Sequence, residues 1–183
     1  GGPKFVSIAR TMAGLVVTEE EACDIVEKFR ASNPKIAGAD RRNPGVWRVL
    51  DNALKNSVGK PRFEIELPSG RIIPHFQPLS GADRNMSVLV PRLGKFMRVK
   101  TWGSNLWETC CQGMARDVFG EAILTAEKRP DSRVVAHTHD ELILECEMDV
   151  SVKEIEDLMC VAPEWAPTLP LAAEGHEMQR YSK

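Results

Sequence analysis

The spacing of apolar residues predicts an amphipathic helix near the N-terminus. Thr18 and Glu21 have the spacing of a capping box, in which the hydroxyl and the carboxylate satisfy free backbone amides at the start of a helix. The helix is expected to run to about Ala31 and to end before Asn33-Pro34, because the residue before a proline disfavours helical backbone angles. Its apolar face comprises Ala22, Ile25, Val26 and Phe29.

The middle of the chain predicts one more helix and then strands. Asn43-Pro44 is expected to open the helix, with the proline in its first position. Residues 62–67 and 71–76 predict two strands joined by a turn, the first from its period-two alternation. The scattered Gly, Pro and Asp of residues 77–95 predict a loop, and residues 96–102 predict another short strand.

The C-terminal part predicts a long helix, a hairpin and a shorter helix. The long helix is expected over about residues 105–126, and two apolar runs within residues 134–147 predict the two strands of the hairpin. A second capping box at Ser151 and Glu154 starts a helix to about Met159, and residues 169–173 predict a final strand.

Composition indicates a soluble protein with a real core. The chain has 183 residues with 43% hydrophobic content, and no apolar run approaches the roughly 20 residues needed to cross a bilayer. The five cysteines include no CxxC pair, so we expect reduced and mostly buried thiols.

Charge is distributed unevenly along the chain. Residues 1–103 carry 17 Lys/Arg against 10 Asp/Glu, a net +7, and residues 104–183 carry 7 against 16, a net −9. This asymmetry fits a nucleic-acid surface beside a cation site.

The most informative chemistry lies at the centre of the C-terminal hairpin. His139, Asp140 and Glu141 interrupt two apolar runs, and an exposed turn would leave the aspartate free to bind a hard cation through oxygen. Magnesium usually takes one or two protein carboxylates and fills its other positions with water and phosphate, so this is half of a two-metal site. Two alternatives stay open: an ordinary surface turn, or a histidine-based metal site that uses His137 as well.

A polar ridge follows the long helix. Glu108, Gln112 and Arg116 recur every four residues and therefore share one face. The plain interpretation is the solvent face of an amphipathic helix. A functional interpretation is that Gln112 reaches the hydrogen-bond acceptors of a DNA minor groove.

Taken together, these segments resemble the C-terminal part of family A DNA polymerases, the DNA polymerase I-like group. TWGSNLWETCCQGMARDVFGEAI followed by VVAHTHDELILE resembles that family's Q-G-x-A-x-D helix and its V-H-D-E hairpin, which is called motif C. Residues 3–36 are similar to the family's fingers segment, LPSGRIIP to its L-x-G-R hairpin, and the final residues to phage-type members. The matching motif residues are Gln112, Gly113, Ala115, Asp117, His139, Asp140 and Glu141.

The resemblance implies a fold and two regions. The fold class is α+β: a partial polymerase palm, with the motif C hairpin of an antiparallel sheet packed on the long helix, plus part of the helical fingers. Residues 1–95 would be the fingers-type segment with a β-hairpin, and residues 96–183 the palm-type segment.

It also implies an activity, template-directed DNA synthesis, and roles for individual residues. Asp140 and Glu141 would bind Mg²⁺ in a two-ion site that this chain supplies only in part. His139 would position the primer terminus and Gln112 would read the minor groove, while Arg71 and Lys100 would contact phosphate. The expected partners are primer-template DNA and dNTP, with no membrane, in the cytoplasm of a bacterial or phage-infected cell.

The chain also departs from the family pattern. Motif A, which supplies the other metal-binding aspartate, and motif B, the helix that holds the incoming triphosphate, have no counterpart here. We therefore expect the chain to be inactive alone, and to need a second polypeptide or a parent protein that carries both motifs. The alternative function is a non-catalytic DNA-binding or structural remnant of such a polymerase.

Overall fold

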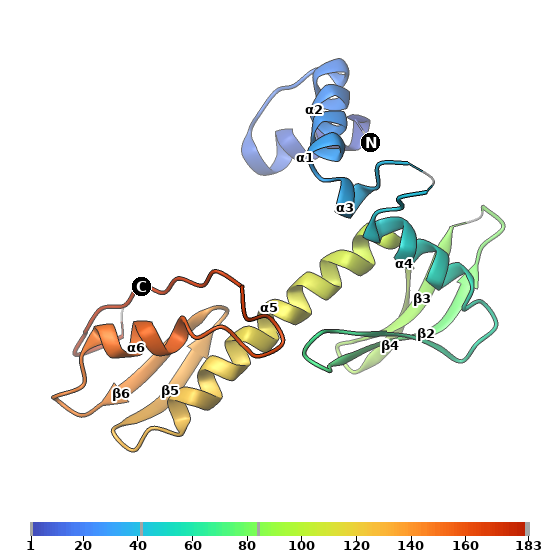
Figure 1. Ribbon diagram of the computed structural model, residues 1–183. Coiled ribbons are helices and arrows are strands. Elements are labelled where there is room, and N and C mark those ends of the chain that lie inside the picture. Colours follow the sequence, from blue (N-terminus) through green and yellow to red (C-terminus); the bar gives the residue numbers. More distant parts are fainter. Residues whose placement is uncertain (1, 41, 84, 182–183) are drawn as a thin grey trace. The chain divides into compact units, whose positions relative to one another are not determined.

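The computed structural model describes residues 2–40, 42–83 and 85–181, and it has an α+β fold (Figure 1). The described elements are, in chain order, α1 (Gly2–Ala13), α2 (Glu19–Ser32), α3 (Pro34–Ala37), α4 (Val46–Lys55), β1 (Arg62–Glu66), β2 (Ile72–Ser80), β3 (Met86–Arg92), β4 (Lys95–Thr101), α5 (Gly103–Glu127), β5 (Ser132–Thr138), β6 (Glu141–Cys146) and α6 (Val152–Met159). The predicted α+β class is confirmed.

The chain forms two compact units, and both are discontinuous in sequence. The first unit runs from the N-terminal helix to Glu64 and resumes over Pro74–Thr109. The second unit contains Ile65–Ile73, which is the tip of the β1–β2 hairpin, and everything from Cys110 onward. The assignment of residues 1–95 and 96–183 to fingers and palm stays a prediction.

In the first unit, α2 begins at the capping box that the sequence predicts. The Glu21 amide donates to the Thr18 hydroxyl at 3.2 Å, and the Thr18 amide donates to the Glu21 carboxylate at 2.8 Å. These bonds hold the pKa of Glu21 below its usual range, because backbone and side-chain donors of Thr18 favour the ionised form. Ala22 is fully buried, and Gly2 of α1 packs so closely on Cys23 that a Cβ at Gly2 would overlap its sulfur.

The helix that Asn43-Pro44 is expected to open, α4, begins later than predicted. Pro44 lies outside it, Gly45 is the N-cap residue of α4, and the helix starts at Val46. Gly45 approaches the backbone of Gly38 so closely that a Cβ at this position would overlap the Gly38 amide nitrogen. The favourable first helical position is instead taken by Pro34, which opens the short helix α3.

The first sheet has the strand order β1-β2-β3-β4. The prediction of a loop over residues 77–95 is wrong, because β2 continues to Ser80 and β3 follows. Gln77 has a φ of +46° within an irregularity of the β2–β3 register, and this bulge admits the fully buried Pro78. Gly70, with a φ of +82°, closes the turn between β1 and β2.

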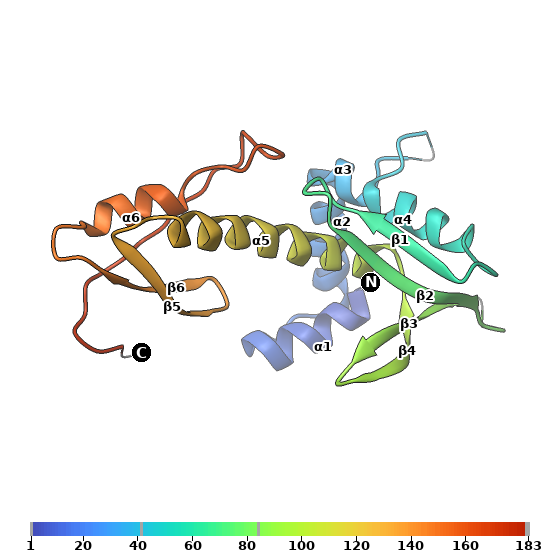
Figure 2. The same cartoon turned by 90° about the horizontal axis from the view of Figure 1, so that it is seen from below.

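In the second unit, β5 and β6 run beside the C-terminal part of α5, and α6 lies next to the hairpin (Figures 1 and 2). The predicted long helix, hairpin and second capping box are confirmed. The strand predicted over residues 169–173 is wrong: this segment is irregular and pairs with neither β5 nor β6. Short apolar runs become strands only where a partner strand supplies hydrogen bonds.

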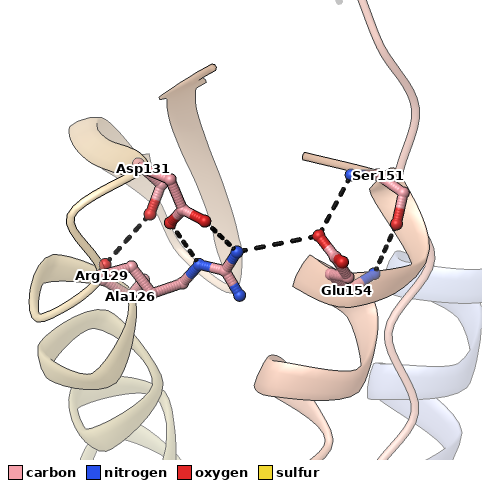
Figure 3. Close-up of polar contacts among 6 residues, drawn as sticks. Ala126, Arg129, Asp131, Ser151 and Glu154 are labelled. Atoms are coloured by element: carbon pink, nitrogen blue, oxygen red, sulfur yellow. Dashed lines mark hydrogen bonds and ion pairs between the residues drawn. The ribbon is translucent and has the colours of Figure 1, made fainter. Parts of the chain in front are cut away.

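Arg129 ties the end of α5 to the start of α6 (Figure 3). Its guanidinium donates two bonds to the Asp131 carboxylate, at 2.8 and 2.6 Å, and lies 3.7 Å from a Glu154 carboxylate oxygen. Glu154 also caps α6 together with Ser151. One planar fork thus fixes the turn that leads into β5 relative to the helix that follows β6.

The five cysteines are free thiols, as expected, but the prediction that most are buried is wrong. Of the five, Cys110 alone is buried, whereas its neighbour Cys111 points outward from α5 because successive helix residues lie on different faces. Burial is the main cause that raises the pKa of the Cys110 thiol. None of the described helices is long and apolar enough to cross a membrane.

Candidate functional site

The β5–β6 hairpin ends in a tight turn formed by two residues. Thr138 pairs with Glu141 across the strands, so His139 and Asp140 form the turn. His139 has a φ of +53°, a backbone conformation that favours glycine and that costs energy in other residues. Residues with strained backbone conformations concentrate at functional sites, so the turn at His139 is a candidate functional site.

Asp140 is exposed at the tip of this turn, and Glu141 beside it is half-buried. Within residues 2–40, 42–83 and 85–181, no group bonds to the Asp140 carboxylate. Two adjacent carboxylates fit the one or two that Mg²⁺ usually takes from a protein. No third His, Cys, Asp or Glu completes a metal-binding group in the described part of the chain. The hairpin could therefore supply two carboxylate ligands, but not a complete set, for a cation.

Glu141 has a partner that the sequence did not reveal. The Tyr181 hydroxyl, 40 residues further along the chain, donates to the Glu141 carboxylate at 3.0 Å. This bond is the main cause that raises the pKa of Tyr181 above 10.0, because a neighbouring carboxylate favours the protonated phenol. The contact orients Glu141 and occupies one of its oxygens, while the Asp140 carboxylate stays open.

The contact predicts how Tyr181 titrates. Because its pKa is raised in the folded protein, the bond is present below the ordinary tyrosine range and is lost as the pH rises through the higher, folded-state pKa. Tyr181 is the single tyrosine of the chain, so near-ultraviolet absorbance of tyrosinate follows it alone. We expect Glu141→Gln to lower the midpoint toward 10.0 and Glu145→Gln, on the same strand, to leave it unchanged. Equal midpoints in all three proteins would show that the contact is not formed in solution.

A bulge sets which side chains of the hairpin face α5. Val134 pairs with Leu144 and His137 with Leu142, but the register shifts between Val134 and Ala136. Val134 and Ala136 therefore lie on opposite faces of the hairpin, although they are two residues apart, because Ala136 pairs with Ile143.

His137 lies between the hairpin and the long helix. Its ring is 6.0 Å from that of Phe119, nearly perpendicular to it, and Arg116 lies 5.7 Å from the centre of the same phenylalanine. His137 therefore packs on α5, and within the described residues it joins no group of three side chains that could hold a metal ion. Phe119 thus contacts both His137 and Arg116, and its place among the apolar residues of a helix gives no sequence signal for this role.

The motif residues of α5 divide into an exposed and a structural group. Gln112 is exposed, in line with its predicted place on a polar ridge. Gly113 lies under the hairpin tip, where a Cβ would be 2.8 Å from the Leu67 side chain. Asp117 binds Arg71 and Ser69 of the same tip, and its side chain is only 8% exposed.

Arg71 and Lys100, the two predicted phosphate contacts, are both engaged in ion pairs. Asp117 bonds the Arg71 guanidinium, which stays half exposed, and raises its pKa. Lys100 belongs to β4 of the first unit and lies 3.0 Å from the Asp83 carboxylate. Of the six predicted site residues, the structure brings His139, Asp140 and Glu141 together at one turn.

Comparison with known proteins adds one relationship to this geometry. The DNA polymerase of Bacillus phage SP02 is 29% identical over 205 aligned positions, which cover all of this chain and 30% of the phage protein. This chain is similar to part of a DNA polymerase. Because it spans less than a third of that relative, most of the phage protein's length lies outside the match. No family model and no solved structure matches the chain.

Proposed function

We propose that this chain is the motif C part of the palm, with adjoining fingers elements, of a template-directed family A DNA polymerase. The observation that carries the proposal is the open Asp140 carboxylate at a strained two-residue turn beside Glu141. Similarity to a phage DNA polymerase along the whole chain supports it. An exposed acidic turn alone would be unremarkable; its combination with this relationship favours nucleotidyl transfer.

Asp140 and Glu141 would take different roles at the metal site. Asp140 would be a direct ligand of Mg²⁺, because no group within the described residues competes for its oxygens. Glu141 would bind more weakly or through water, since Tyr181 already occupies one of its oxygens. When bound, Mg²⁺ would stabilise the attacking 3′-oxygen of the primer and the charge on the pyrophosphate that leaves.

The remaining predicted residues would position DNA. His139, held at the tip by its unusual backbone conformation, would contact the primer terminus next to the metal ligands. Gln112 is exposed and both donates and accepts hydrogen bonds, so it could recognise minor-groove acceptors without sequence preference. Arg71 would approach phosphate with the half of its guanidinium that Asp117 leaves in solvent, and Lys100 would do so in exchange for its ion pair with Asp83.

A complete site would need a second acidic residue and a triphosphate-binding helix from elsewhere. The residues of this chain offer one adjacent pair of carboxylates, and a two-metal clamp requires ligands on both sides of the reacting phosphate. We propose that motifs A and B come from the rest of a longer protein or from a second polypeptide. The large unmatched share of the phage polymerase supports this division.

Primer extension tests the proposal directly. The purified chain is mixed with a polypeptide that carries motifs A and B, on a primed template with dNTP and Mg²⁺. We expect extension by the mixture and none by either component. If the mixture binds the template but never extends the primer, the non-catalytic alternative is favoured and the proposal fails.

A further inference from the structure

The outer face of the first sheet combines aromatic and basic side chains. Directly paired residues of antiparallel strands share a face, and the register pairs Pro91 with Phe96 and Leu89 with both Arg98 and Phe76. Alternation along β4 adds Lys100. We call Phe76, Phe96, Arg98 and Lys100 the aromatic–basic face.

The opposite face of the sheet carries the buried residues Met86, Val88 and Thr101, so the aromatic–basic face is the one turned to solvent.

Phe96 is unusually open for a residue of its size. The residue is 61% exposed, although its ring meets the ring of Phe76 at 5.4 Å between centroids in a nearly perpendicular contact. That edge-to-face arrangement holds the Phe96 ring in place and leaves much of its surface uncovered. A held, exposed aromatic ring is a platform on which a planar ligand can stack.

Basic side chains surround the Phe96 ring, and two of them are held in place by hydrogen bonds or an ion pair. Arg98 donates to the Gln77 carbonyl at 3.0 Å and to the Gln77 side-chain oxygen at 3.3 Å, so the bulge in β2 orients its guanidinium. Lys100 lies in an ion pair with Asp83. Residues 86–101, which form β3, the turn and β4, contain Arg92, Lys95, Arg98 and Lys100 and no Asp or Glu.

We propose that the aromatic–basic face binds single-stranded DNA, with a base stacked on Phe96 and phosphates beside Arg98 and Lys95. A duplex keeps its base faces covered by stacking, whereas a single strand can present one to an exposed ring. Arg92, Lys95 and Arg98 of the β3–β4 hairpin, which unlike Lys100 form no ion pair among the described residues, complement a phosphate backbone that passes the ring. The site belongs wholly to the first unit and uses none of the residues of the β5–β6 turn.

Binding of a fluorescent oligothymidylate of about 12 nucleotides to the whole 183-residue chain tests this site by anisotropy. We expect Phe96→Ala to raise the dissociation constant by about tenfold or more, the usual consequence of losing one stacked base. Phe96→Leu should weaken binding similarly while it preserves an apolar contact with Phe76, and Phe96→Trp should retain binding. Leu93→Ala is the matched control, since Leu93 is a fully exposed apolar residue at the turn of the same hairpin.

Salt dependence separates stacking from simple charge attraction. Lys95→Gln should reduce the slope of log affinity against log salt by about 0.7, the value for one phosphate contact on a single strand. The proposal is overturned if the chain binds no oligothymidylate, if duplex DNA binds as tightly as the single strand, or if Phe96→Leu binds like the unaltered chain. None of these outcomes bears on Asp140, so failure here is distinguishable from failure of the polymerase assignment.

Discussion

Asp140→Asn is expected to abolish primer extension by the complete enzyme, with a loss of roughly 10²–10³-fold or more. The substitution keeps the size of the side chain and removes the negative charge that a divalent cation requires. Template binding should change little, because phosphate contacts come from basic residues elsewhere. Extension rates and template affinity are measured on the same preparation, so that lost chemistry is separated from lost binding.

A matched control lies on the same hairpin. Glu145→Gln neutralises an exposed carboxylate of β6 that lies away from the His139–Asp140 turn. The extension rate of this variant should stay near that of the unaltered enzyme. Glu141→Gln should fall between the two, since Tyr181 shares that carboxylate. Near-normal extension by Asp140→Asn would remove Asp140 from the metal site and with it the chemical basis of the proposed function.

Asp117→Asn is expected to destabilise the second unit, with a fall in melting temperature of roughly 5 °C at neutral pH. The Asp117 carboxylate accepts a bond from Arg71 Nε at 2.6 Å and a further bond from the Ser69 hydroxyl. Asparagine keeps the shape but loses the charge-assisted character of both bonds, and it places an amide donor against donors. Thermal unfolding followed by circular dichroism measures the change.

The same substitution should flatten the acid dependence of stability. The bond from Arg71, followed by that from Ser69, holds the pKa of Asp117 below its ordinary 3.8. A carboxyl whose pKa is lower in the folded state stabilises the fold above the unfolded-state pKa, and this contribution is lost as the pH falls through the folded-state pKa. The unaltered chain should therefore lose more stability between pH 6 and pH 3 than Asp117→Asn does. Asp149→Asn, an exposed position, should behave like the unaltered chain. Parallel curves for all three proteins would contradict a stabilising role for Asp117.

These two aspartates show why motif matching needs a structure. Both belong to segments that resemble family motifs, yet Asp140 lies open at a turn and Asp117 is almost covered by a hairpin tip 46 residues away in sequence. Gly113, from the same motif, is explained by packing, because the Leu67 side chain occupies the space of a Cβ. Residue type and spacing alone do not separate a ligand from an anchor.

Errors of the sequence-based predictions share one cause. Residues 77–95 read as a loop because Gly and Pro are scattered through them, but a bulge at Gln77 lets β2 continue past a buried proline. Residues 169–173 read as a strand because they are apolar, but no strand pairs with them. Whether an extended segment becomes a strand depends on its neighbours in space, which local pattern does not contain.

The sequence by itself determined the local features: both capping boxes, the long helix, and the turn that carries His139, Asp140 and Glu141. Each depends on residues within a few positions of one another, so short-range spacing is enough. Only the tertiary structure decided the contacts of Tyr181 with Glu141 and of Arg71 with Asp117, and the exposed ring of Phe96 on its sheet face. These join or expose side chains through the path of the whole chain, and no local pattern encodes that path.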